Sequence, residues 1–415
     1  MTRLDWVRGL PRYVQVAVPA LILLLALGGA VLLLSARRPA PVAIVPTASP
    51  SPGAGGSPSP SPGDSPSPSP TSADVTPPPL QPTAPPAAGC GPAPSGGFPG
   101  SQLAANYPVA LAWSPDGRLF WTERSGGVRV YEGGSVHNFA DVATVTTERG
   151  GGYSERGLLG LAISGNFVFA MYSNTDYATQ TIVRWTDCAG VATNQLVIAS
   201  GLPAGSDCCH KGGRLAVSPD GHLFATIGDN HNAPSAQAGG DLRGKVTRFN
   251  LDGGGRMVWT SGLRNPFGIA FAPDGTLAVT NNGPSGEAGT PCGSCGDEFY
   301  VVGGSAGVDY QWPLCWGYSH PINGDSTCGG HPGPQYSTEG GPYARSASYF
   351  VAPTGMTWSS KRGGFVFCAN SNGALYQYTS QGNVTDTGIR QCSLDVKQGP
   401  DGALYTSNSG AIYRH

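Results

Sequence analysis

The feature that most constrains the fold is a short phrase that occurs four times in the chain. Each copy begins with a Pro-Asp-Gly turn and continues into a strand that ends in small or polar residues. The copies are SPDGRLFWTE from Ser114, SPDGHLFATIGD from Ser218, APDGTLAVTNNG from Ala272 and GPDGALYTSNSG from Gly399. Proline presets φ and glycine accepts a positive φ, so the three residues favour a turn before the strand. The repetition indicates several related β units.

We expect these units to form one all-β domain over residues 98–415. Short apolar or alternating runs recur there between turns rich in Gly, Asn and Asp, and no amphipathic helix of useful length interrupts them. About 318 residues at roughly 40–50 per four-stranded blade suggest six or seven blades, and we predict a six-bladed β-propeller. A jelly roll or two stacked sandwiches would supply the strands, but neither explains the repeated phrase.

The N-terminal part predicts a single membrane span. Residues 1–12 carry three arginines against one aspartate and are expected on the cytoplasmic side. Residues 13–34 are uncharged, and about 22 residues give a helix of roughly 33 Å, long enough to cross a bilayer. A cleaved signal peptide is the alternative. We favour an uncleaved signal anchor because Arg37 and Arg38 follow the apolar run directly, where a small-residue cleavage site would otherwise stand.

Residues 35–97 form a predicted linker. Ser-Pro pairs repeat through it, and from Pro39 onward its charged residues are Asp64 and Asp74. Such a segment cannot bury a core and is expected to be a disordered, extended stalk. The ten cysteines of the chain are even in number and lie beyond the apolar run, which favours disulfides in an oxidising compartment. The localisation expected is therefore a cell membrane, single-pass, with the C-terminal domain extracytoplasmic.

Charge and cysteine spacing exclude several classes of site. The net charge is −2 and 12% of the residues are charged, so nucleic acid is not an expected partner and membrane contact is assigned to the N-terminal helix. Cys292 and Cys295 have the spacing of a zinc pair, but Cys315 and Cys328 are too far apart to complete a four-cysteine site. Disulfides are the better interpretation. The adjacent Cys208 and Cys209 pair either with separate partners or with each other.

One hairpin predicts an acid–base pair. The segment CCHKGGRLAVSPDGHLFATIGDN runs from Cys208 to Asn230, and its turn returns the chain to its starting level. His210 and Asp229 can therefore meet at one rim of the sheet. A histidine oriented by a carboxylate is a simple base for an alcohol proton, although a surface histidine beside a turn is the alternative. In a propeller the polar strand endings Glu123–Arg124 and Asn281–Asn282 would converge on the same face.

Four other segments carry candidate site residues. They are SERGLLGLA from Ser154, GLRNPFGIA with Arg264 and Asn265, NNGPSGEAGTPCGSCGDEFYVV with Gly283, Pro284, Glu287, Asp297 and Glu298, and GVDYQWPLCWGY with Trp312. Backbone carbonyls and carboxylates on the third segment are hard oxygen ligands that suit Ca²⁺. The aromatic fourth segment can wall a sugar site or pack a loop.

The phrases ERGLLGLA, HKGGRLAVSPDGHLFATIGD, GLRNPFGIAFAPDG, NNGP followed by GDEF, and YQWP occur in this order. In these phrases the chain resembles the pyrroloquinoline quinone (PQQ)-dependent soluble glucose and aldose sugar dehydrogenases, the glucose/sorbosone dehydrogenase family. The resemblance implies a six-bladed propeller with PQQ and Ca²⁺ at one face. It also implies the following roles: His210 as base, Asp229 as its carboxylate, Arg264 and Asn265 against the cofactor, Gly283 and Pro284 as carbonyl ligands of Ca²⁺, and Glu155 where some members have a glutamine beside the quinone. Arg214 and Trp312 are expected near the substrate.

The last part of the chain departs from that pattern. Where better-studied members place a lysine and two arginines against the cofactor carboxylates, this chain has Ser371, Cys392 and Leu394. Other cations lie nearby in the sequence but out of register: Lys361, Arg362, Arg390 and Lys397. Losing two charge-assisted contacts of about 1.5–3 kcal/mol each would weaken cofactor binding roughly a hundredfold or more.

The function expected is that of a membrane-anchored, extracytoplasmic quinoprotein that oxidises an aldose sugar or related alcohol. Hydride would pass to PQQ, with His210 as general base and Ca²⁺ assisting, and electrons would go on to an acceptor that the sequence does not identify. The alternative is a catalytically inactive propeller that binds a carbohydrate or protein at the cell surface. A Ca²⁺-dependent lactone hydrolase ranks last, since it would want more carboxylate and asparagine ligands than the sequence offers.

Overall fold

The computed structural model describes Cys90 and Cys328 and residues 97–284, 296–302, 304–318, 320–322, 330–338, 351–379 and 383–415. The predicted membrane span at residues 13–34 and nearly all of the linker lie outside these residues. Across the part that is described, no helix has the length and apolar character needed to cross a bilayer. The short helix η2 (Ala233–Gln237) has 3-10 geometry.

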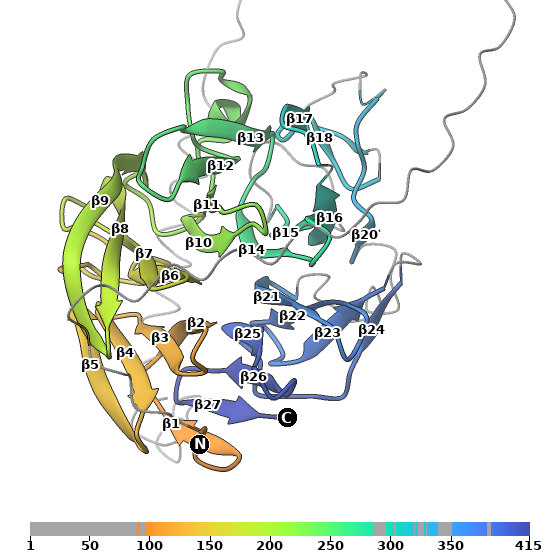
Figure 1. Ribbon diagram of the computed structural model, residues 1–415. Helices are drawn as coiled ribbons and strands as arrows, with labels where there is room; N and C mark the ends of the chain where they lie inside the picture. The colour runs from red at the N-terminus through yellow and green to blue at the C-terminus, as the bar shows by residue number, and fades with distance from the viewer. Residues whose placement is uncertain are drawn as a thin grey trace, which may run out of the picture. The chain divides into compact units, whose positions relative to one another are not determined.

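Six of the seven sheets in the described part of the chain are arranged as blades around a common centre (Figure 1). Blades 1 and 2 contain β2 (Pro108–Trp113), β3 (Leu119–Glu123), β4 (Gly127–Glu132) and β5 (Ser135–Asp141), then β6 (Leu158–Ser164), β7 (Phe167–Ser173), β8 (Thr179–Cys188) and β9 (Val191–Pro203). Blade 3 contains β10 (Gly212–Val217), β11 (His222–Ile227), β12 (Lys245–Asn250), β13 (Met257–Ser261) and the added β17 (Val308–Asp309). Blade 4 contains β14 (Pro266–Phe271), β15 (Leu277–Asn281), β16 (Glu298–Val302) and β20 (Tyr336–Ser337).

Blades 5 and 6 complete the ring (Figure 1). They contain β21 (Pro353–Ser359), β22 (Gly364–Ala369), β23 (Leu375–Tyr378) and β24 (Val384–Asp386), then β25 (Asp395–Gln398), β26 (Leu404–Ser407), β27 (Ala411–Arg414) and β1 (Gln102–Ala104). A small separate sheet pairs β18 (Cys315–Trp316) with β19 (His320–Pro321). Strand β1 pairs with β27, so a strand from the start of the domain completes the last blade and closes the ring. The predicted six-bladed propeller is confirmed.

The four repeated turns all lie between the first and second strands of a blade. They precede β3, β11, β15 and β26. Gly117, Gly221, Gly275 and Gly402 adopt φ of +84°, +84°, +89° and +75°. A side chain is strained in that region, so glycine is required at this point of the turn. Because the first two strands of each blade are antiparallel, the polar residues after the second strand lie at the face opposite these turns.

The apolar core lies between neighbouring blades. Phe120, Leu161 and Trp185 pack between blades 1 and 2, and Trp121 packs with Tyr405 between blades 1 and 6. Further clusters fill the other blade interfaces. Each blade is therefore buried on both faces against its neighbours. This packing fixes the inner strand ends, and with them the loops of the candidate site.

Four disulfides tie the described part of the chain, as the cysteine count predicted. Cys90 pairs with Cys188, Cys208 with Cys209, Cys315 with Cys328, and Cys368 with Cys392. No described cysteine is free. Of the two alternatives for the adjacent cysteines, the structure shows the bond between neighbours. The predicted pair Cys292 and Cys295 lies outside the described residues.

Candidate active site

The candidate site is built from loops that follow or precede inner strands at one face of the propeller. His210 stands just before β10, and Asp229 follows the end of β11. In the next blade Arg264 and Asn265 precede β14, while Asn282, Gly283 and Pro284 follow β15. These segments are connected directly, because the Asp229 backbone N–H donates to the Arg264 carbonyl at 2.7 Å. The structure therefore brings the predicted residues of blades 3 and 4 together.

His210 and Asp229 form a buried pair. Nδ1 of His210 lies 2.7 Å from Oδ1 of Asp229, and the two residues are 4% and 1% exposed. The indole N–H of Trp312 donates to the other carboxylate oxygen at 2.7 Å. His210 has a φ of +55°, a left-handed conformation that a non-glycine residue adopts only when its surroundings hold it there. Both ends of the pair are thus fixed by neighbours.

The electrostatics of this pair favour a neutral base beside an ionised carboxylate. Burial lowers the pKa of His210 and outweighs the hydrogen bond to Asp229, while the charge of Arg264 lowers it further. Burial pushes the pKa of Asp229 upward, but the bond to His210 and the charge of Arg264 hold it below its ordinary value. The carboxylate accepts from Nδ1–H, which leaves the Nε2 lone pair of neutral His210 as the basic atom.

His231 is a site residue that the strand pattern did not reveal. Its Nε2 lies 3.1 Å from Nε2 of His210, and the two rings meet edge to face with centroids 4.0 Å apart. Its backbone N–H donates to Oδ1 of Asp229 at 3.0 Å. The one available signal in the sequence was its place two residues after Asp229.

A network of amides joins blades 3 and 4 next to this pair. Oδ1 of Asn281 accepts the backbone N–H groups of Arg264 and Asn265 at 3.1 and 3.0 Å. Oδ1 of Asn265 accepts the backbone N–H of Gly212 at 3.3 Å. The Arg264 guanidinium donates to the carbonyl of Asn282 at 2.8 Å and lies 6.0 Å from the Trp312 ring centroid. Arg264 and Asn265 are therefore held at fixed positions beside His210.

The predicted calcium loop presents oxygen atoms. Oδ1 of Asn282 is buried without a partner among the described residues. Next to it, the Gly283 backbone N–H donates to Oδ1 of Asp297 at 2.8 Å. The other oxygen of Asp297 accepts from Val351 and Ala352 at 2.7 and 2.9 Å. Burial raises the pKa of Asp297 to about 6. Oδ1 of Asn282 and the main-chain carbonyls of Gly283 and Pro284 are oxygen atoms of the kind that Ca²⁺ prefers, so these residues could hold the ion. Glu287 lies outside the described residues.

A cavity of about 130 Å³ opens at the same face. Its lining comes from blades 1, 2, 4, 5 and 6: Tyr107, Val109, Arg124, Tyr153, Ser154, Glu155, Leu159, Asn265, Phe267, Asn282, Ala352, Thr354, Asn370 and Leu394. Glu155, Asn265 and Asn282 were predicted in this region. His210 does not line the cavity. The next residue, Lys211, contacts the lining, because Oε2 of Glu155 accepts the backbone N–H of Lys211 at 3.3 Å.

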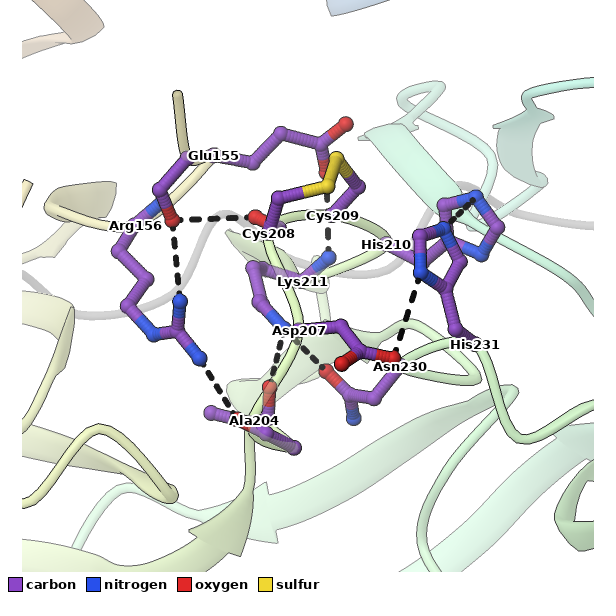
Figure 2. The surroundings of a disulfide bond; sticks show 12 residues. Glu155, Arg156, Ala204, Asp207, Cys208, Cys209, His210, Lys211, Asn230 and His231 are labelled. Carbon is purple, nitrogen blue, oxygen red and sulfur yellow. Dashed lines mark hydrogen bonds and ion pairs between the residues drawn. A yellow bond between two sulfur atoms is a disulfide. The ribbon is translucent and has the colours of Figure 1, made fainter. Parts of the chain in front are cut away.

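The Cys208–Cys209 disulfide lies beside Glu155 and directly precedes His210 in the chain (Figure 2). Figure 2 shows it beside the carboxylate of Glu155. The carbonyl of Cys208 accepts the backbone N–H of Glu155 at 2.8 Å and the hydroxyl of Ser154 at 3.0 Å. These contacts anchor the disulfide to blade 2, and they help to fix the position of the adjacent His210. Its sulfur atoms are bonded to each other and are not available as thiolate metal ligands, although they lie close to His231.

Both residues predicted near the substrate are buried. Trp312 is 0% exposed and supports Asp229. Arg214 is 4% exposed and lies on inner strand β10, where it donates to the Leu394 carbonyl at 2.5 Å. Its guanidinium stacks 4.8 Å from the ring centroid of Phe267, which lines the cavity above. In the described structure these two side chains support groups of the site.

The late blades supply no cation at the positions where the resemblance expects them. Ser371 is exposed and donates to the Val351 carbonyl at 3.0 Å. Cys392 is 0% exposed in its disulfide, and Leu394 is 8% exposed. Among the described lining residues of the cavity, Arg124 is the one cation and Glu155 the one anion. Arg124 comes from blade 1 and donates to the Thr146 carbonyl at 2.7 Å.

Two proteins of known name are similar in sequence to this chain. Quinoprotein glucose dehydrogenase B of Acinetobacter calcoaceticus is 30% identical over 261 residues, a match that covers 51% of this chain and 51% of that protein. Aldose sugar dehydrogenase YliI of Escherichia coli is 28% identical over 342 residues, which covers 73% of this chain and 87% of that protein.

Solved structures show the same fold. An oxidoreductase (glucose dehydrogenase) from Thermus thermophilus superposes with a TM-score of 0.60 and 25% identity, covering 75% of this chain and 99% of that one. The PQQ-bound aldose sugar dehydrogenase of Streptomyces coelicolor gives a TM-score of 0.57 at 21% identity, covering 78% and 96%. The family model described as glucose/sorbosone dehydrogenase matches residues 105–414. The chain therefore belongs to the glucose/sorbosone dehydrogenase family.

Proposed function

We propose that this protein is a quinoprotein oxidoreductase that oxidises an aldose sugar or related alcohol. The observation that carries the proposal is the buried His210–Asp229 pair, held 2.7 Å apart beside Arg264 and Asn265. Family membership supports it, because curated relatives are named glucose dehydrogenase and aldose sugar dehydrogenase. The chain aligns with only about half of the first of these relatives, so its activity and substrate are proposals.

In the proposed reaction His210 removes the hydroxyl proton of the sugar. The O–H bond breaks as an Nε2–H bond forms on His210, and Asp229 stabilises the resulting imidazolium through Nδ1–H. Trp312 orients Asp229 by its indole N–H, so its proposed role is positioning. Burial keeps His210 neutral at neutral pH by lowering its pKa, which suits a base. A bound PQQ supplies the two-electron acceptor for the hydride that leaves the carbon.

The residues present fit PQQ and Ca²⁺ in part. The unpartnered Oδ1 of Asn282 and the carbonyls of Gly283 and Pro284 would hold Ca²⁺. Arg264, Asn265 and Arg124 would face the cofactor, with Glu155 at its edge. Ser371, Cys392 and Leu394 offer no charge to its carboxylates. We therefore propose that PQQ binds here more weakly than in members with the late-blade cations.

The proposed location is the outer side of a cell membrane. The uncharged run at residues 13–34 motivates a signal anchor, and the Pro/Ser-rich segment at 35–97 would hold the domain away from the bilayer. Four disulfides in the described part of the chain are typical of an oxidising compartment. Electrons would pass from the reduced cofactor to an acceptor in the same compartment.

Reconstitution tests the enzymatic proposal. The full chain, purified in detergent, is loaded with PQQ and Ca²⁺ and assayed with a series of aldoses and an artificial electron acceptor. We expect turnover that requires both additions and that His210→Ala lowers by roughly 10²–10⁴-fold. Absence of turnover, together with an unchanged cofactor spectrum, would refute the proposal.

A catalytically silent binding propeller is the second candidate. The observation that favours it is the replacement of the late-blade cations by Ser371, by a disulfide at Cys392 and by Leu394. It predicts carbohydrate or protein binding that survives His210→Ala and the omission of PQQ. A glycan array with wild-type and His210→Ala protein separates the two candidates.

A further inference from the structure

A second cavity lies at the face of the ring opposite the candidate active site. Its volume is about 320 Å³, against about 130 Å³ for the cavity beside Glu155. The Pro-Asp-Gly turns of blades 3 and 4 form its rim, because Pro219, Asp220, Pro273 and Asp274 all line it. Its size falls within the range of small-molecule sites, roughly 300–1,000 Å³. The chain thus contains a space of ligand size that the proposed reaction does not use.

Three aromatic side chains form the apolar part of this second cavity. Phe224, Trp259 and Phe271 line it, and Phe224 meets the other two rings edge to face with centroids 5.2 and 4.9 Å apart. Phe224 is buried, whereas Trp259 and Phe271 are half-buried. An aromatic ring that stays partly exposed at a cavity gives a ligand a large and rigid apolar contact.

Two hydrogen-bond donors without partners belong to residues of the same lining. The Arg248 guanidinium lies 5.8 Å from the Trp259 ring centroid. Nε of Arg248 and Nε1 of Trp259 are both buried without a hydrogen-bond partner among the described residues. Buried donors are nearly always paired in folded proteins, and neither of these groups can accept a hydrogen bond. They indicate a ligand that carries acceptor oxygens.

The rim of the second cavity supplies acceptors. Oδ1 of Asp274 accepts the backbone N–H of Thr276 at 2.9 Å, and in the described part of the chain Oδ2 has no hydrogen-bond partner. Asp220 accepts the hydroxyl of Ser218 and lies 3.2 Å from His222. Ionised carboxylates only accept, so the cavity combines donors on its wall with acceptors at its rim. Hydroxyl groups match such a lining, because each one both donates and accepts.

We propose that this second cavity binds a neutral hexose unit of a glycan, at a site separate from the active site. A sugar ring has hydroxyl groups and an apolar C–H face, so it can contact Trp259 and Phe271 while it exchanges hydrogen bonds with Arg248 and Asp274. Two carboxylates and one cation line the cavity, which disfavours an acidic sugar. The site does not depend on the proposed reaction. It would hold the domain on a polysaccharide.

Calorimetric titration of the detergent-purified full chain, without PQQ, tests this sugar site. The probes are maltotriose, cellotriose, mannotriose and galactotriose. We expect at least one of them to bind at one equivalent, and Trp259→Leu and Arg248→Met each to raise its Kd about tenfold to a hundredfold. The matched control is Trp358→Leu, because Trp358 packs edge to face on Phe365 near the blade 5 turn at the same face and does not line the cavity. It should bind as the wild type does, and thermal unfolding checks that each variant is folded.

His210→Ala separates the second cavity from the active site and should bind the same trisaccharide with the wild-type Kd. Binding that is lost in His210→Ala and kept in Trp259→Leu would overturn the inference, as would the absence of binding to all four probes. Trp259-dependent binding of a synthetic peptide of residues 76–86, TPPPLQPTAPP, in place of the sugars would also overturn it. None of these outcomes depends on turnover, so the proposed function and this inference fail separately. In a Trp259→Leu background, the glycan array reports on the remaining sites alone.

Discussion

Blades 3 and 4 differ from blades 5 and 6 in what they present at the same face of the ring. In blades 3 and 4, His210, Asp229 and Arg264 are each at most 4% exposed and are held by neighbouring groups. In blades 5 and 6, the corresponding loops present an exposed serine at Ser371, and a disulfide cysteine and a leucine at Cys392 and Leu394. Blades 3 and 4 thus present titratable side chains at this face, whereas at the three positions of blades 5 and 6 the side chains carry no charge.

Under the proposed function, this difference separates the groups of the reaction chemistry from the positions expected to anchor the cofactor. In the proposed site, the base, its carboxylate and the oxygen donors come from two adjacent blades, whose loops are joined by hydrogen bonds such as that from the Asp229 N–H to the Arg264 carbonyl. In the proposed site, any cations that bind the cofactor carboxylates in addition to Arg264 and Arg124 would come from blades 5 and 6. The apolar clusters between blades hold the strands of both halves, whatever side chains the loops carry at this face. The predictions below break or sharpen this contrast.

The largest effect is expected from His210→Ala in the first half. Removing a general base lowers kcat by roughly 10²–10⁴-fold, whereas PQQ binding should change little because its anchoring groups remain. Steady-state kinetics and a cofactor titration measure the two quantities. His222→Ala, on the opposite face, serves as control. A kcat that changes less than about twofold in His210→Ala would remove His210 from the reaction.

A large loss of stability is expected from removing the Cys368–Cys392 disulfide of blades 5 and 6. Cys368 and Cys392 are separated by 24 residues, and opening a loop of this length should lower the free energy of unfolding by about 3 kcal/mol. Urea denaturation of Cys368→Ala/Cys392→Ala measures it. The matched control is Cys208→Ala/Cys209→Ala, whose bond joins neighbours and closes no loop of the unfolded chain. Equal losses in both double variants would contradict this account.

Restoring one charge to the second half should tighten cofactor binding. Ser371 is exposed next to the cavity residue Asn370, so Ser371→Lys can place an ammonium at the face without displacing core atoms. A charge-assisted contact of about 1.5–3 kcal/mol corresponds to a Kd that falls roughly tenfold to a hundredfold. Ser360→Lys adds the same charge just beyond the far end of β21 and should leave the Kd unchanged. Equal Kd values in all three proteins would show that anchoring does not depend on this position.

The smallest expected effect is the position of the pH profile. The pKa of His210 lies below its ordinary value, mainly through burial, so turnover should persist below about pH 6.5 and decline only as the pH falls through the lower folded value. The sign for stability is the same: below the unfolded pKa the unfolded state binds more protons at this group, so its contribution to folding is lost as the pH falls. A profile that declines from above pH 7, in protein shown to be folded, would contradict a buried neutral base.

Much of the scaffold was predictable from the sequence because its turns are local. Pro-Asp-Gly needs glycine at the positive φ of Gly221, and the strand length after it carries Asp229 back to His210. What could not be predicted depends on contacts between distant segments. Trp312 reaches Asp229 across 83 positions of sequence. His231 turns toward His210 because Asn230 and His231 adopt left-handed backbone at φ of +54° and +59°. Such geometry is set by the surrounding loops and leaves no periodic signal in the sequence.

The burial of Arg214 and the bond between Cys208 and Cys209 were also beyond a pattern of residues. Arg214 has the position expected on an inner strand, yet the sequence does not tell whether its guanidinium faces the cavity or the backbone just before β25. The structure shows it donating to the Leu394 carbonyl. For the cysteines, either pairing fits the count, and the fold decides it by leaving the two sulfurs beside each other.

Cofactor uptake by the wild-type full chain tests most directly whether this face is a quinone site with one complete and one depleted half. The detergent-purified protein is titrated with PQQ, with and without Ca²⁺, and the absorbance of the quinone is followed. The account predicts saturation at one equivalent that depends on Ca²⁺, at a Kd that Ser371→Lys lowers. An absorbance that never saturates under either condition would contradict it.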